Sequence, residues 1–187
     1  MFKQIIRRIQ QYSTGRSILI LFVTTVALAV LINASTLPFS ARMITEQSGG
    51  LMLLDMHFSY TPNDAYKLLE ALGKAGRQAY LTMHLTLDLV FPVVYSLLFS
   101  FSIAWFLKRL LPPDHFLQWI VLIPFIAGLA DLIENVNITI MGLTYPTRLD
   151  GLVRLSSLMT TLKFGLMPLG VLCILICAIL LAIRRKS

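Results

Sequence analysis

Charged side chains are scarce in this chain. Asp, Glu, Lys and Arg make up only 13% of its 187 residues, whereas soluble globular proteins contain about a quarter. The mean hydropathy is +0.77, and 57% of the residues are hydrophobic. Because so few polar groups cannot cover a protein surface in water, a soluble globular fold is excluded. We expect the lipid bilayer to be the partner that surrounds the chain.

Cysteine is also scarce, and the short signatures of common metal and redox sites are missing. The two cysteines, Cys173 and Cys177, stand four positions apart within an apolar run, which is not a CxxC pair. We interpret them as reduced packing residues. No HExxH or similar motif occurs. We therefore expect no metal and no cofactor.

The basic residues do not indicate a nucleic-acid partner. Lys and Arg outnumber Asp and Glu by 16 to 9, which gives a net charge of +7. These basic residues cluster beside apolar runs and form no soluble patch. At such positions positive charge sets membrane topology and attracts anionic lipid. We expect no nucleic acid to bind.

Four apolar runs are long enough to cross a bilayer as helices. They cover about residues 17–36, 80–107, 116–141 and 155–183, and a transmembrane helix needs about 20 residues. The basic segment before the first run also fits a signal peptide, but the length of that run and the later spans favour an uncleaved anchor. We predict an all-α fold, a membrane-embedded four-helix bundle that forms a single domain over residues 1–187.

Lysine and arginine are distributed unevenly about the predicted spans. Six lie in the longer loops on one side, where acidic residues offset them: Arg42, Lys67, Lys74, Arg77, Arg148 and Arg154. Nine lie close to span ends on the side of both termini: Lys3, Arg7, Arg8, Arg16, Lys108, Arg109, Arg184, Arg185 and Lys186. Loops that are dense in Lys and Arg usually remain in the cytoplasm. We therefore predict a multi-pass protein of the cell (inner) membrane with both termini cytoplasmic.

The first loop, residues 37–79, carries the signals of an external amphipathic helix. A capping residue, a first-turn proline and an acidic capping-box residue mark its start: Thr61, Pro62 and Asp64. Apolar residues then recur at helical spacing: Ala65, Leu68, Leu69 and Leu72. Gly73 and Gly76 are expected to end this helix, which either covers the bundle as a lid or serves as a linker. Upstream, residues 51–58 are too apolar for water and are expected to pack on the bundle mouth.

Ionisable side chains inside the spans are the candidates for chemistry. Each costs about 2.5 to 3.5 kcal/mol on insertion, so such groups face a bundle interior and have partners. The candidates are His84, Asp88, Asp131, Glu134 and Lys163. At a rise of about 1.5 Å per residue they share one depth, nearer the long loop. The expected ligand contacts are Tyr80, Tyr95, Asn135 and Thr160, with Arg148 at the rim. We predict a polar chamber that opens outward.

This polar layer allows three interpretations. It joins the helices, because unpaired buried carboxylates are costly. Alternatively it binds a small amphipathic or lipid-like ligand, or belongs to an accessory subunit of a membrane-protein partner. Thirdly, it forms an isomerase- or cyclase-like acid/base site for an apolar lipid, with Glu134 or Asp131 as acid, His84 paired to Asp88 as base, and Lys163 stabilising charge. Metal binding by the His and carboxylates is a weaker alternative without a local signature.

Three segments resemble a pattern seen in a family of small bacterial integral membrane proteins with four spans and no assigned activity. They are TPNDAYKLLEALGKAGRQAY at 61–80, DLVFPVVY at 88–95 and DLIEN at 131–135. The resemblance extends over most of the chain from residue 55 onward. It implies the same four-span architecture and no particular activity.

The chain is also similar, more faintly, to the EXPERA superfamily, which includes the emopamil-binding sterol isomerases. In that comparison His84 and Asp88 correspond to a His and acid pair, and Glu134 to an acid from the next helix. The resemblance implies that these side chains surround a lipid-like substrate. The chain departs from it in having four spans where those proteins have five. Trp105 and Trp119 also lie far from the polar layer.

Overall fold

The chain folds entirely into helices and connecting loops. The structure is a computed structural model that describes residues 2–184, and no strand occurs in that range. The helices are α1 (Phe2–Tyr12), α2 (Gly15–Asn33), α3 (Ala41–Gln47), α4 (Pro62–Ala71), α5 (Gly73–Leu85), α6 (Leu87–Leu110), α7 (Ile123–Thr144) and α8 (Asp150–Arg184). Two short 3-10 helices are η1 (Leu54–Met56) and η2 (Phe116–Leu122). The all-α prediction is confirmed.

Four helical segments of the described chain are long and apolar enough to cross a membrane. They are Gly15–Asn33, Gly73–Leu110, Phe116–Thr144 and Asp150–Arg184. The second helical segment begins at Gly73 and not near residue 80, because α5 starts with a charged turn that the apolar pattern does not include. Most apolar side chains of α2 and α8 are exposed, which fits surfaces that face lipid. The chain thus has the architecture of a multi-pass membrane protein.

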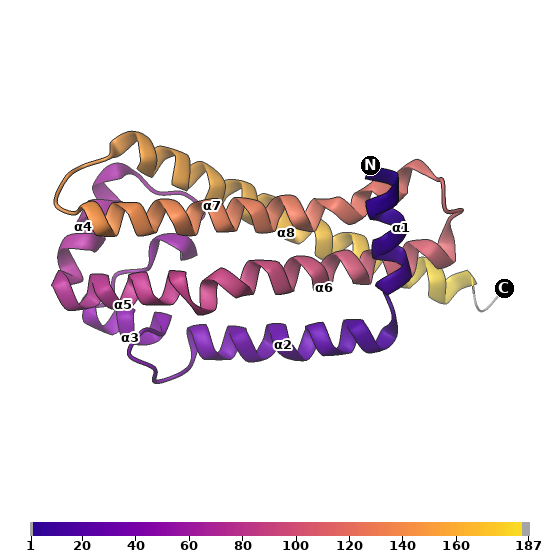
Figure 1. Ribbon diagram of the computed structural model, residues 1–187, viewed down its shortest axis with the longest axis horizontal. Helices are drawn as coiled ribbons and strands as arrows, with labels where there is room; N and C mark the ends of the chain where they lie inside the picture. Colours follow the sequence, from indigo (N-terminus) through magenta and orange to yellow (C-terminus); the bar gives the residue numbers. More distant parts are fainter. Residues whose placement is uncertain (1, 185–187) are drawn as a thin grey trace.

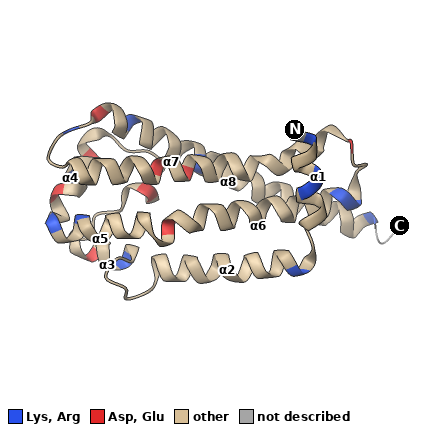
Figure 2. Cartoon of the chain, viewed as in Figure 1, with Lys and Arg blue, Asp and Glu red and all other residues tan. Residues whose placement is uncertain are grey.

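The four long segments lie side by side, and α6 packs against α2, α7 and α8 (Figure 1). The chain end at α1 and the end of α8 lie at one end of the bundle, which we call the terminal end. The opposite end, which holds α3, η1 and α4, is called the loop end. Arg185 and Lys186, counted in the charge pattern, lie outside the described residues. Figure 2 shows the acidic residues of α6 and α7 in the half nearer the loop end.

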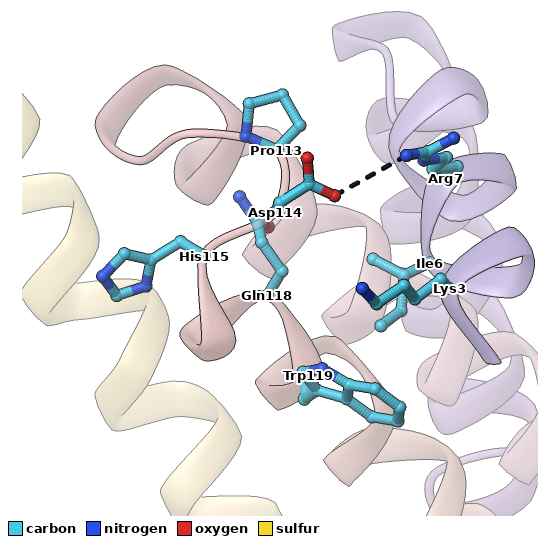
Figure 3. Close-up of a pocket in the computed structure, with 8 residues that line it drawn as sticks. All are labelled: Lys3, Ile6, Arg7, Pro113, Asp114, His115, Gln118 and Trp119. Carbon is cyan, nitrogen blue, oxygen red and sulfur yellow. Dashed lines mark ion pairs between the residues drawn. The ribbon is translucent and has the colours of Figure 1, made fainter.

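Helix α1 crosses the terminal end of the bundle at a steep angle (Figure 1). It packs through the buried Ile6 and Ile9, and Lys108 donates to two carbonyl oxygens at its C-terminal end, at 2.6 and 3.1 Å. Arg7 points toward Asp114 in the loop between α6 and η2, 3.6 Å away (Figure 3). The pocket beside this ion pair holds about 20 Å³, room for one water molecule. It is too small for an organic ligand.

Helix α4 closes part of the loop end. Thr61 and Asp64 form the predicted capping box, and hydrogen bonds from Thr61 hold the pKa of the Asp64 carboxyl below its usual value. The apolar stripe is buried as expected: Ala65, Leu68, Leu69 and Leu72. Gly73 ends the helix at a φ of 59°, which favours glycine. The expectation for Gly76 was wrong, because α5 runs through it and packs it against Leu72.

Two apolar clusters flank the polar layer. The loop-end cluster includes Leu54, Leu69, Tyr80, Met83, Ile138, Met141 and Val153. The terminal-end cluster includes Ile6, Ile103, Ala104, Leu107, Val121 and Cys177. Along α6, α7 and α8 the buried ionisable residues Asp88, Asp131, Glu134 and Lys163 lie between these clusters. The charged groups are therefore separated from the terminal end by packed apolar side chains.

Candidate functional site

An ion-paired cluster joins α7 to α8. Lys163 Nζ lies 3.0 Å from Asp131 Oδ1 and 2.7 Å from Glu134 Oε2. The Tyr95 hydroxyl donates to Asp131 Oδ2 at 3.0 Å, and the Thr160 hydroxyl donates to Glu134 Oε1 at 2.5 Å. All five side chains are buried. Thus both carboxylates have charged and neutral donors, which offset the cost of their burial.

Helical spacing explains why these groups meet. Asp131 and Glu134 are three positions apart on α7, and Thr160 and Lys163 are three positions apart on α8, so each pair shares one helical face. The two faces are opposed where α7 packs on α8. The sequence placed these residues at one depth in the membrane, and the structure shows that their side chains are in direct contact.

A second pair forms where α5 meets α6. His84 Nδ1 lies 2.9 Å from Asp88 Oδ2, and the Tyr80 ring packs on the imidazole at a centroid distance of 4.5 Å. The backbone departs from helical geometry at Thr86, between the two members of the pair. The other ring nitrogen, His84 Nε2, is buried without a hydrogen-bond partner in the described chain. The contact with His84 therefore fixes the position of the Asp88 carboxylate.

Pro92 creates a polar contact between α6 and α7. Proline has no N–H, so the carbonyl of Asp88, one turn earlier, loses its usual helical partner. Asn135 fills this role, because its Nδ2 donates to the Asp88 carbonyl at 2.8 Å. Asn135 on the facing helix thus supplies the hydrogen-bond donor that Pro92 lacks.

The segment before α4 covers the polar layer. Leu53 and Leu54 are fully buried, as expected for a segment packed on the bundle mouth, and Asp55 Oδ1 accepts a hydrogen bond of 2.7 Å from the Tyr80 hydroxyl. Tyr80 also accepts from the Leu54 N–H. Burial raises the pKa of the nearby Tyr60 phenol well above its ordinary value. The cover is therefore η1, whereas α4 contributes no side chain to the cavity described next.

A partly open cavity of about 300 Å³ adjoins the ion-paired cluster, between α2, η1, α6, α7 and α8. Its charged lining residues are Asp55, Asp88, Asp131 and Lys163. Its aromatic lining residues are Phe91, Tyr95 and Phe164, and the others are Ile32, Asn33, Met56 and Met167. The lining thus combines polar and apolar side chains, as an amphipathic ligand requires.

The structure separates the predicted site residues into three groups. Four line the cavity: Asp88, Tyr95, Asp131 and Lys163. Five lie behind its wall and support it: Tyr80, His84, Glu134, Asn135 and Thr160. Arg148 lies apart from both, because it is exposed at the loop end and contacts Asn63, Asp150 and the Tyr66 ring. It does not reach the cavity.

Seven cavity residues were not among the predicted site residues: Ile32, Asn33, Asp55, Met56, Phe91, Phe164 and Met167. Asp55 precedes the predicted amphipathic helix, and Phe164 and Met167 look like ordinary lipid-facing residues of the last span. For Asp55 one signal was available, since it is the only charged residue of the apolar stretch 51–58. Phe164 and Met167 gave no such signal, because aromatic and aliphatic residues are common throughout a span.

The cavity environment carries excess negative charge. Four carboxylates meet there, from Asp55, Asp88, Asp131 and Glu134, and the cations that contact them are Lys163 and, when protonated, His84. No group of three or more His, Cys, Asp or Glu side chains within residues 2–184 has the geometry to hold a metal ion. A positively charged or proton-donating guest would therefore complement the site.

No model of a known protein family, no curated protein and no solved structure matches this chain. The family resemblances noted from the sequence accordingly stay predictions. The function has to be argued from the geometry of the cavity.

Proposed function

We propose that this membrane protein binds a small amphipathic molecule with a positively charged head group in the polar cavity. The observation that carries the proposal is a single space of about 300 Å³ that combines three carboxylates with aromatic and aliphatic walls. This volume is at the lower end of the range for ligand pockets, so the ligand is small. Such a molecule would enter from the bilayer, into which its apolar part already partitions.

The hydrogen bonds around the cavity leave acceptors for a cationic head. The Tyr80 hydroxyl donates to one carboxylate oxygen of Asp55, and His84 contacts one carboxylate oxygen of Asp88. The second oxygen of each carboxylate has no hydrogen-bond partner within residues 2–184. Asp131 differs, because both of its oxygens are bound. An ammonium group would donate to the unpaired oxygens, and the aromatic walls favour a cation further.

A set of probes with one chain length tests this proposal. We expect decylammonium to bind the purified protein in non-ionic detergent at least about tenfold more tightly than decanol or decanoate. The reason is that a hydrogen bond to a charged group contributes about 1.5 to 3 kcal/mol, and 1.4 kcal/mol is a factor of ten. Titration calorimetry measures the three affinities.

The matched variants are Asp88→Asn in the cavity and Asp150→Asn at the exposed start of α8. Asp88→Asn should weaken decylammonium binding about tenfold, whereas Asp150→Asn should leave it unchanged although the net charge changes equally. Equal affinity for the three probes would contradict the cationic preference. If none of the three bound, the binding function itself would be wrong.

Acid/base catalysis is the second candidate, and the 2.9 Å contact between His84 and Asp88 favours it. Only Asp88 of this pair lines the cavity, so Asp88 would exchange a proton with a bound apolar lipid and His84 would position it. This assignment differs from the sequence-based hypothesis, in which His84 is the base. Catalysis would transfer deuterium from heavy water into the lipid, whereas binding alone would not.

We further propose that the terminal end faces the cytoplasm. The support is the density of Lys and Arg beside the spans at that end. In a chain with both native cysteines replaced by alanine, a membrane-impermeant maleimide should label Ser59→Cys on intact cells. It should label Gln11→Cys only after lysis. The reverse pattern would show that the protein is inserted in the opposite orientation.

A further inference from the structure

A second site lies outside the polar cavity, along α5. A groove of about 650 Å³ runs between α5 and the C-terminal end of α7, and it shares no lining residue with the cavity. Lys74 and Arg77 line its start at the loop end, and Leu81 and Leu85 follow on the same helical face. The groove therefore changes from basic to apolar along its length.

Arg77 is held in a defined position at the basic part of the groove. Its guanidinium carbon lies 4.1 Å from the centre of the Tyr145 ring, and its NH1 donates to the Leu69 carbonyl at 2.8 Å. The other two nitrogens, Nε and NH2, have no hydrogen-bond partner in the described part of the chain. A guanidinium fixed in this way loses little freedom when it binds an anion.

The two cations of the groove are not neutralised by the protein. None of the ion pairs formed within residues 2–184 includes Lys74 or Arg77. Lys74 is exposed one turn before Arg77 on α5. Two positive charges thus stand together without a carboxylate partner, which is the arrangement that phosphate groups bind.

The apolar part of the groove is suited to hydrocarbon. Leu85 is 57% exposed and Leu143 is 68% exposed, so both present apolar surface. Thr82 and Thr86 also line this part, but their hydroxyls donate to backbone carbonyls of α5 and offer no donor to a ligand. From Arg77 to Leu85 the helix rises about 12 Å, roughly the length of half an acyl chain.

We infer that this groove binds a phospholipid of the leaflet that meets the loop end. Arg77 and Lys74 hold the lipid phosphate, and one acyl chain lies along Leu81, Leu85 and Leu143. The position of Tyr145 beside the guanidinium agrees with this placement, since tyrosine is enriched at the level of lipid head groups. The cavity between α6, α7 and α8 plays no part in this binding.

Two lipids with the same acyl chains provide the test. Native mass spectrometry of the full chain in non-ionic detergent would compare dioleoyl phosphatidylglycerol with dioleoylglycerol, which lacks the phosphate. We expect the phospholipid to bind at least about tenfold more tightly. Arg77→Gln should lower its affinity about tenfold, and Arg77→Lys should lower it less, because it keeps the charge and loses the planar fork.

The matched control is Arg154→Gln, which removes one exposed cation of the loop end outside the groove. It should leave phospholipid binding unchanged. Lys74→Gln provides a second variant whose side chain is exposed, so its result stands even if Arg77→Gln lowers the melting temperature. Equal binding of the two lipids, or the same phospholipid affinity for Lys74→Gln and Arg154→Gln, would overturn the inference.

Discussion

Replacing Lys163 by methionine is expected to lower the free energy of unfolding by about 3–5 kcal/mol. Lys163 supplies the positive charge between Asp131 and Glu134, at 3.0 and 2.7 Å, and all three side chains are buried. Methionine keeps most of the volume but leaves two carboxylates together without a cation. Denaturant unfolding in non-ionic detergent measures the loss.

A triple variant separates charge from packing. Adding Asp131→Asn and Glu134→Gln to Lys163→Met removes all three charges, so most of the lost stability should return. The control is Arg42→Gln, which breaks an exposed ion pair with Glu46 and should cost less than about 1 kcal/mol. If Lys163→Met cost no more than Arg42→Gln, the ion-paired cluster would not stabilise the bundle.

Gly128→Ala is expected to lower the free energy of unfolding by about 1–3 kcal/mol, because it forces α6 and α7 apart. A Cβ atom at Gly128 would overlap Ser96 Oγ and would lie 2.9 Å from the Pro92 carbonyl oxygen. The serine can rotate, but only by giving up its 2.9 Å hydrogen bond to the Pro124 carbonyl. The backbone oxygen has no such freedom. The same unfolding titration measures the effect.

Gly165→Ala is the matched control within a membrane-spanning helix. Apart from its chain neighbours and the adjacent backbone of α8, no described atom lies within 4 Å of a Cβ built at Gly165, so this change should cause no loss of stability. Ser96→Gly should recover part of the stability lost in Gly128→Ala, since it removes the nearer of the two obstacles. Equal stability of the two alanine variants would show that α6 and α7 do not need a glycine at their crossing.

Several features of the candidate site could be predicted from the sequence because they depend on helical geometry alone. Carboxylates three residues apart on one span share a face, and counting residues from the span ends placed Asp88, Asp131, Glu134 and Lys163 at one depth. Pro92 likewise predicts a free carbonyl one turn earlier. The structure shows the partner of that carbonyl, Asn135.

The division between cavity lining and support could not be predicted in this way. Hydrophobic pattern specifies which helical face points inward, but it does not specify how far each helix is rotated against its neighbours. The break at Thr86 also separates His84 on α5 from Asp88 on α6, so only Asp88 of the pair lines the cavity. The cavity lining also includes Asp55, whose position depends on how a loop segment packs.

The scarcity of charged residues in the sequence indicated that the bilayer surrounds this protein. The four apolar runs and the all-α class follow, because few backbone structures can cross a bilayer. Tertiary structure alone decided what the few remaining charges do. The packing of α7 on α8 paired Lys163 with two carboxylates. The packing of the segment before α4 made η1 the cover of the cavity, and the packing of α5 beside α7 left Lys74 and Arg77 unpaired in a groove. These outcomes depend on distances between helices, and no local sequence pattern specifies such distances.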